Sequence, residues 1–329
     1  MTELPRNTIL TGDAVDVLTE VPEASVDCVV TSPPYYQLRD YGVAGQLGLE
    51  PTVDEWAGGL RAVARQLARV LKPSGAWWLN LGDSFSRHDR YGAPVKALLL
   101  APERLLLMLA RDGWLVRNKV IWAKTNPMPS SIRDRLSLTW EVIYLFVRSP
   151  SYYFDLDAIR EPHTSVGARS AREPLGKRPD WAGPLAGSQD GLRRAREAGV
   201  PGHPLGKNPG DVWRVATRGF KGAHFATFPP ELIRRPILAT CPELVCSDCG
   251  QAWGSIGGHS DGPAGPMCRF ARSPRPGVVL DPFFGTGTVG LVARELGRDW
   301  LGIELKPEYV EIARERLGLA AEAQLEAAA

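Results

Sequence analysis

One segment near the carboxyl end constrains the fold more than any other. Residues 278–288 read Val-Val-Leu-Asp-Pro-Phe-Phe-Gly-Thr-Gly-Thr, so an apolar strand ends at an acidic residue and two glycines precede a helical stretch. Gly285 and Gly287 let the backbone turn tightly and approach a ligand without a Cβ in the way. Together with Gly290 they also match the dinucleotide fingerprint, and such loops serve several nucleosides. The segment predicts a ligand-binding strand, turn and helix of an α/β sheet.

The rest of the chain alternates between strand and helix patterns. Strands are predicted at 27–31, 76–81, 116–123, 142–147, 278–280 and 300–303, and helices at 56–71, 102–111, 289–296 and 308–317. The Lys-Pro-Ser-Gly run at 72–75 should end the first helix. Such alternation implies a layered α/β fold around a mostly parallel sheet. A chain of 329 residues, 44% of them hydrophobic, can bury a sizeable core.

The stretch 158–222 lacks this periodicity and is rich in Pro, Gly, Arg and Ser. It holds 12 Lys and Arg against 6 Asp and Glu, although the whole chain has a net charge of only +2. A structureless insertion of this length is uncommon in a compact domain unless it is functional or disordered. Its charge fits a polyanion-binding region, and a solvated basic loop is the alternative.

A second short motif follows the first predicted strand. Residues 29–35 read Val-Val-Thr-Ser-Pro-Pro-Tyr, and the prolines Pro33 and Pro34 keep this segment extended beyond the carboxyl end of the strand, where ligands bind in open α/β sheets. The Ser32 hydroxyl and the Pro33 carbonyl can accept the two N–H bonds of an exocyclic amine, and Tyr35 offers a face for an extruded base. Alone, the tetrapeptide could equally be an ordinary turn that ends a strand.

Together, the two motifs resemble the beta group of the amino-methylating DNA methyltransferases, the cytosine-N4 and adenine-N6 family of the Ser-Pro-Pro-Tyr type, in which the catalytic motif precedes the cofactor loop. The resemblance implies a Rossmann-like fold that binds S-adenosylmethionine (AdoMet), with catalytic residues Ser32, Pro33, Pro34 and Tyr35. It implies the cofactor-binding residues Asp13 on the adenine side, Glu304 on the ribose, and Asp281, Phe283, Gly285, Gly287, Thr227 and Phe228 toward the methionine moiety. Thr286 and Thr288 of the same loop are also expected to bind the cofactor.

The same resemblance divides the chain. Residues 1–157 are expected to form the catalytic part of the methyltransferase domain, 158–222 a target-recognition region, and 223–319 the AdoMet-binding part with a Cys-rich insertion at 241–272, followed by a tail at 320–329. The substrate would be double-stranded DNA. A separate cognate restriction endonuclease would be a partner, and the enzyme would be a monomer or a homodimer.

Serine before Pro-Pro-Tyr favours the N4 amine of cytosine in this family, whereas aspartate there favours the N6 amine of adenine. Adenine-N6 methylation therefore stays an alternative, because both amines present two donors to the same acceptors. A catalytically silent AdoMet-fold module that binds nucleic acid is a second alternative, against which the intact Ser32, Tyr35, Asp281 and Glu304 argue. An oxidoreductase would carry its glycine loop near the amino terminus. RNA as the substrate is not excluded by these motifs.

Four of the five cysteines gather in one stretch, namely Cys241, Cys246, Cys249 and Cys268. Their spacing resembles the first half of a zinc knuckle, and the second half is incomplete. Four thiolates could hold a structural zinc ion, or His259 could replace Cys241, or the thiols could simply be reduced. Cys28 lies within the first strand and is expected in the core.

The longest apolar run, 97–110, contains a proline and two charged residues and is too short to span a bilayer. The amino terminus lacks the apolar core of a secretory signal. We therefore expect a soluble protein without a membrane partner, located in the cytoplasm.

Overall fold

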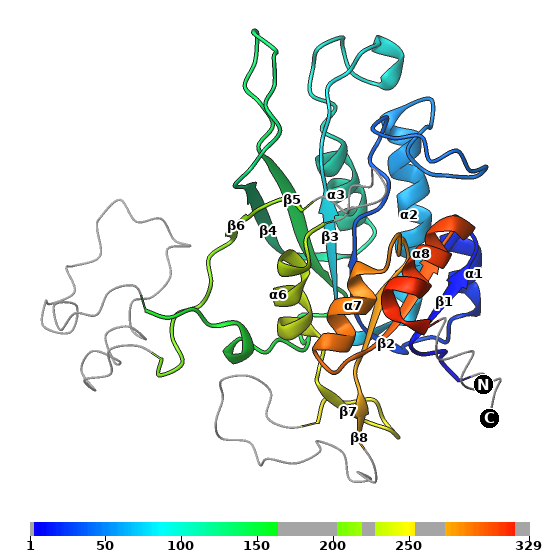
Figure 1. The fold of residues 1–329 in the computed structure, drawn as a ribbon, viewed down its shortest axis with the longest axis vertical. Coiled ribbons are helices and arrows are strands. Elements are labelled where there is room, and N and C mark those ends of the chain that lie inside the picture. Colours follow the sequence, from blue (N-terminus) through cyan, green and yellow to red (C-terminus); the bar gives the residue numbers. More distant parts are fainter. Residues whose placement is uncertain (1–2, 164–202, 219–227, 254–273, 320–329) are drawn as a thin grey trace, which may run out of the picture. The chain divides into compact units, whose positions relative to one another are not determined.

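The computed structural model describes residues 3–163, 203–218, 228–253 and 274–319 (Figure 1). The chain divides into two compact units. One comprises Met1–Asp155 and Asp211–Ala329, and the other comprises Leu156–Gly210. In the second unit, Glu161 forms an antiparallel bridge with Lys207, and Arg160 donates a hydrogen bond to Asp157.

The first unit is built on an eight-stranded sheet in the order β1-β10-β9-β2-β3-β5-β4-β6. Its strands are β1 (Thr8–Thr11), β2 (Val26–Thr31), β3 (Leu71–Leu81), β4 (Leu115–Lys124), β5 (Trp140–Val147), β6 (Val212–Val215), β9 (Val278–Asp281) and β10 (Asp299–Glu304). The run from β1 to β3 is parallel, β5 is antiparallel to both of its neighbours, and β6 is parallel to β4. The predicted α/β class with a mostly parallel sheet is confirmed.

Helices cover both faces of this sheet. One face carries α1 (Ala14–Glu20), α2 (Val53–Val70) and α3 (Ala101–Arg111), and the other carries α6 (Pro230–Thr240), α7 (Thr288–Glu295) and α8 (Pro307–Leu317). The strands alternate between the two layers, because successive side chains point to opposite faces. In β3, Trp77 and Leu79 belong to the first apolar cluster and Trp78 to the second.

Helix α2 illustrates why the sequence forms these elements. Thr52 precedes the helix and accepts a hydrogen bond from the backbone N–H of Glu55, while its hydroxyl donates to the Glu55 carboxylate. This arrangement satisfies one of the free N–H groups at the start of the helix. The apolar residues recur every three or four positions and are buried from Val53 to Val70.

The structure differs from the sequence-based expectation at 72–75. These residues lie within β3, which begins at Leu71 rather than at Ala76. The strand pairs with β2 through a register shift between Val26 and Cys28. The Lys72 ammonium donates to the buried Asp27 carboxylate at 2.6 Å, and this ion pair holds the residues before Ala76 against the sheet.

Several short elements were not predicted. They are β1, α1, α6, β6, the hairpin of β7 (Leu244–Cys246) and β8 (Pro274–Pro276), and the single turns η1 (Asp89–Tyr91) and η2 (Asp157–Ile159). Helix α1 has only seven residues, and α6 contains Pro236, so neither gives a clear period. Among the described residues, no helix is long and apolar enough to cross a membrane.

Close packing beneath the glycine loop requires a residue without a side chain in β10. The Phe284 ring stacks on Trp300, with ring centroids 5.1 Å apart and an angle of 11° between the planes. A Cβ at Gly302 would lie 2.4 Å from the Phe284 ring. Because both aromatic rings are buried, neither can easily move aside.

We predict that Gly302→Ala destabilises the protein by about 1–3 kcal/mol through overpacking. Gly58→Ala is the matched control, because its Cβ would meet no atom within 4 Å on the exposed side of α2. That substitution should stabilise by about 0.5–1 kcal/mol, since alanine loses less backbone entropy in a helix. Urea unfolding of the three proteins measures both changes. Equal stability of Gly302→Ala and the parent would contradict the packing argument.

Candidate active site

The two sequence motifs meet at the centre of the sheet. Strand β2 is paired with β9, in the register Cys28 with Val279 and Val29 with Leu280. At their carboxyl ends, the Thr31 hydroxyl donates a hydrogen bond of 2.6 Å to the Asp281 carboxylate. Residues that are 250 positions apart in the chain thus begin two adjacent loops at one edge of the sheet.

The glycine loop takes the shape that its sequence predicts. Gly285 and Gly287 have φ values of 52° and 81°, in the left-handed region that glycine adopts without strain. The backbone N–H of Phe284 donates to the carbonyl of Ile303, which fastens the loop to β10. The two phenylalanines then diverge, because Phe284 enters the core while Phe283 lines a cavity.

Glu304 closes β10 beside this loop, as predicted. One carboxylate oxygen accepts from the backbone N–H of Gly285 at 2.7 Å, and the other accepts from that of Lys306 at 2.8 Å. Burial raises the pKa of Glu304, while these backbone donors oppose the rise. Each oxygen keeps a second lone pair, so the carboxylate can still accept hydrogen bonds from a ligand hydroxyl.

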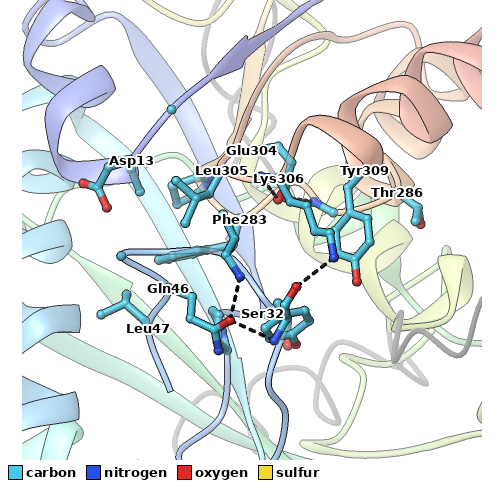
Figure 2. A pocket seen from close by; sticks show the side chains of 18 residues that line it. Asp13, Ser32, Gln46, Leu47, Phe283, Thr286, Glu304, Leu305, Lys306 and Tyr309 are labelled. Atoms are coloured by element: carbon cyan, nitrogen blue, oxygen red, sulfur yellow. Dashed lines mark hydrogen bonds between the residues drawn. The ribbon is translucent and has the colours of Figure 1, made fainter. Parts of the chain in front are cut away.

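A cavity joins the two motifs (Figure 2). Its lining includes Ser32 and Pro34 from the first motif and Phe283, Gly285 and Thr286 from the second. It also contains Gly12, Asp13, Glu304, Leu305, Lys306 and Tyr309, together with Tyr41, Gln46 and Leu47 of the segment after β2. A ligand that fills this cavity touches both motifs.

Other residues predicted from the sequence hold the walls of the cavity. Asp13 directly precedes α1 as its N-cap, and its carboxylate accepts from the backbone N–H of Val15 at 2.8 Å. Arg316 of α8 donates to the hydroxyls of Thr286 and Thr288. Gly287 precedes α7 in the left-handed conformation. Thr288 and Gly287 support the loop from behind and do not line the cavity.

Of the predicted Thr227–Phe228 pair, one residue lies within the described part of the chain. Thr227 lies outside the described residues. Phe228 packs against the second apolar cluster and is not in the cavity lining. Its role at the methionine moiety stays a prediction.

The catalytic motif is fixed by its backbone and by its hydroxyls. The Trp56 indole donates to the carbonyl of Pro34 at 2.9 Å. Among the described residues, no donor reaches the carbonyl of Pro33, but Pro33 is buried and does not line the cavity that Ser32 and Pro34 line. The Ser32 hydroxyl donates to the Tyr35 oxygen at 3.1 Å, and the Tyr35 hydroxyl donates to Glu141 at 2.7 Å.

Sequence reasoning missed one wall of the cavity. The Gln46 side-chain oxygen accepts from the backbone N–H groups of Tyr41 and Val43, which folds this segment over the cavity. The Lys306 ammonium donates to the Tyr41 carbonyl at 2.7 Å, and Tyr41 meets Tyr309 edge to face. Glycines at 42, 45 and 48, all with positive φ, were the sequence signal for a structured loop.

A wide groove of about 1010 Å³ lies at the same edge of the sheet. Its lining includes Gln37 and Leu38, which follow the catalytic motif and Tyr36 in the chain. Two loops line it, which follow β3 and β4 and are coloured cyan and green in Figure 1. Their lining cations are Arg87, Lys96, Arg133 and Arg135.

The cysteines do not form a metal site within the described part of the chain. Cys241 and Cys246 are buried and Cys249 is exposed, and no group of three or more His, Cys, Asp or Glu side chains lies together there. Burial raises the pKa of the Cys241 thiol well above its usual range. Cys268 and His259 lie outside the described residues, so structural zinc stays a prediction. Cys28 is buried, as expected.

Comparison with solved structures gives the same fold over nearly the whole chain. A putative DNA modification methylase from Thermus thermophilus, complexed with S-adenosyl-L-methionine, is 25% identical, has a TM-score of 0.52, and matches 94% of each chain. PvuII DNA methyltransferase, described as cytosine-N4-specific, has a TM-score of 0.59 at 19% identity, with 94% of this chain and 86% of that one covered.

Sequence comparison agrees. The family model described as DNA methylase, of the N6 and N4 type, matches residues 26–315. Type II methyltransferase M.XycI of Xanthomonas campestris pv. cyanopsidis is 36% identical over 94% of this chain and 87% of its own length. M.Cfr9I of Citrobacter freundii is 35% identical over 96% and 89%. The chain therefore belongs to the N6/N4 DNA methylases, the amino-methylating DNA methyltransferases that use AdoMet as cofactor.

Proposed function

We propose that this protein transfers a methyl group from AdoMet to the N4 amine of a cytosine that is extruded from double-stranded DNA. One observation carries the proposal. Ser32 lines the same cavity as Phe283, Gly285 and Glu304, and the Thr31–Asp281 hydrogen bond holds the two motifs together. An amine bound at Ser32 would therefore face a cofactor bound at the glycine loop.

The cavity residues suit AdoMet. The glycine loop has no Cβ at Gly285, so its backbone can lie close to the ligand. Glu304 offers a carboxylate to the ribose hydroxyls. Asp13 lies at the wall of the cavity far from Ser32, where the adenine would bind. When bound, AdoMet would supply an electrophilic methyl group, and a nucleophile in line with the carbon–sulfur bond would take this group and release the sulfur as a neutral thioether.

The amine requires help because its lone pair is delocalised into the ring of the base. Ser32 and the Pro33 carbonyl can accept its two N–H groups, which localises the lone pair on a tetrahedral nitrogen aimed at the methyl group. The Pro34 carbonyl is already bonded to Trp56 and takes no part. Cytosine is favoured over adenine because serine stands at position 32.

Incubation with labelled AdoMet and unmethylated genomic DNA should give N4-methylcytosine. Ser32→Ala should lower transfer by about 10²–10³-fold, because one preorganised acceptor is removed. AdoMet binding should change little. Nucleoside mass spectrometry reads the product. N6-methyladenine alone would refute the choice of base, and AdoMet binding without transfer to DNA would favour the silent module.

The groove supports duplex DNA as the substrate. Among the described residues, neither Arg87 nor Arg133 has a carboxylate partner, and both are exposed. The Arg135 guanidinium lies 3.5 Å above the Phe85 ring, so an apolar surface and a cation stand together in the groove. We infer that the DNA backbone next to the extruded base lies in this groove. The stretch 158–222 would then read the sequence.

Substitution of both arginines should make DNA binding weaker and less dependent on salt. Every phosphate that the protein no longer neutralises reduces the slope of log K against log salt by about 0.9, so Arg87→Ala with Arg133→Ala should reduce it by about two. Arg234→Ala with Arg314→Ala is the charge-matched control on α6 and α8, outside the groove. Titration of labelled duplex DNA at several salt concentrations tests this. Equal slopes in both double variants would exclude the groove as the binding site of the DNA backbone.

Asp281 should make stability depend on pH. Burial raises the pKa of Asp281 to about 7, against the hydrogen bonds from Thr31 and the Phe283 N–H, which lower it. A pKa above the unfolded value favours the folded state at low pH, and this contribution is lost as the pH rises through about 7. Asp281→Asn has no such proton to lose. Its free energy of unfolding, measured with urea from about pH 4 to about pH 8, should fall less with pH than that of the cofactor-free parent.

An equal fall in both proteins would contradict the raised pKa.

Three further assignments stay predictions. A separate restriction endonuclease and a monomeric or homodimeric state rest on the family resemblance. A cytoplasmic location rests on the sequence, which has no apolar run long enough to span a bilayer and no secretory signal core.

A further inference from the structure

We propose that Ser32, Tyr35 and Glu141 form a proton relay, in which Glu141 takes up the proton that the amine releases when it is methylated. The inference rests on the proposed function and adds a residue that the catalytic motif does not contain. Glu141 is not among the residues that line the cavity, so it acts through Tyr35 and Ser32 as a positioning residue.

The chemistry of the groups fixes the direction of the hydrogen bonds. A carboxylate can only accept, so the single proton of the Tyr35 hydroxyl points to Glu141, 2.7 Å away. The Tyr35 oxygen must then accept from Ser32, at 3.1 Å. Asn80 Oδ1 lies farther from the same hydroxyl, at 3.2 Å, and is uncharged. The proton of Ser32 is thereby engaged, and its lone pairs remain for an amine in the cavity.

Glu141 is held as a charged acceptor. The Lys124 ammonium donates to one carboxylate oxygen at 2.5 Å, and the Asn80 amide donates to the other at 3.1 Å. The side chain of Glu141 is 13% exposed, so a proton received there can pass to solvent. Lys124 and Tyr35 are the titratable groups bonded to it, and Lys124 also lies over the Trp122 ring.

The fold leaves room for this contact at one glycine. A Cβ at Gly82 would lie 2.7 Å from the Tyr35 ring and 3.5 Å from the Glu141 carboxyl carbon. Burial first, and then the charge of Glu141, raises the pKa of Tyr35 well above 10. Tyr35 therefore does not ionise alone. It releases its proton to Glu141 only as it receives one from Ser32.

The amine nitrogen forms the new bond to carbon with its lone pair, and the electron pair of the broken carbon–sulfur bond stays on sulfur. One N–H proton passes to Ser32 Oγ, the Ser32 proton passes to the Tyr35 oxygen, and the Tyr35 proton passes to Glu141. Glu141 ends as a neutral acid, and both hydroxyls are restored. Proton transfer by a positioned group contributes about 10²–10⁴-fold in rate.

Single-turnover transfer from labelled AdoMet to DNA tests the relay. Glu141→Gln keeps the shape and loses the base, so the rate should fall by about 10²-fold or more. Tyr35→Phe should cause a similar loss, and the double variant should be no slower than either, because the residues act in one path. Dissociation constants for AdoMet and DNA should stay unchanged. Glu103→Gln is the control and should leave the rate unchanged. Glu103 makes an ion pair with Lys119, which lies on β4 like Lys124, but this pair is not part of the relay.

Chemical rescue separates a base from a structural brace. Glu141→Ala should regain activity with formate, which can occupy the vacated position and accept a proton, and should not with formamide, which has similar shape and no charge. Equal rescue by formamide, or a Glu141→Gln rate within about threefold of the parent, would overturn the relay. A parent protein that transfers no methyl group to DNA would instead refute the proposed function.

Discussion

The site depends on the position of β2 between β9 and β3. Parallel pairing on both sides brings three strand ends to one edge of the sheet, and each end carries a part of the chemistry. Asp281 accepts a hydrogen bond from the Thr31 hydroxyl at this edge, and this bond couples the catalytic motif to the glycine loop. A displaced β2 would separate the amine from the methyl donor even if each motif kept its local shape.

The change from parallel to antiparallel pairing has a chemical role. Because β5 runs against β3, its first residues lie at the edge where β2 and β3 end, and Leu81 pairs with Val142. Glu141 thus stands beside Tyr35 although it begins a strand. Lys124 ends the neighbouring β4 and reaches the same carboxylate. In an all-parallel sheet, the amino end of β5, and Glu141 with it, would lie at the opposite edge.

Contiguous features could be predicted from the sequence. The glycine loop and the carboxylate of Glu304 depend on neighbours in the chain, and the structure has both in the expected local form. Residues that depend on strand pairing could not be predicted in this way. Glu141 gave no signal because only the order of β3, β5 and β4 brings it to Tyr35. The start of β3 at Leu71 was missed because Lys72 is held by the distant Asp27.

The pairing of the first strands with the last has a consequence for synthesis of the protein. Strand β1 pairs with β10, with Thr8 opposite Leu301, and β2 pairs with β9. A ribosome completes both amino-terminal strands long before it reaches their partners. One edge of β2 therefore waits unpaired, and such edges invite aggregation unless a chaperone covers them. Since the glycine loop arrives with the same late strands, a nascent chain cannot assemble its cofactor site until β9 and β10 have been synthesised.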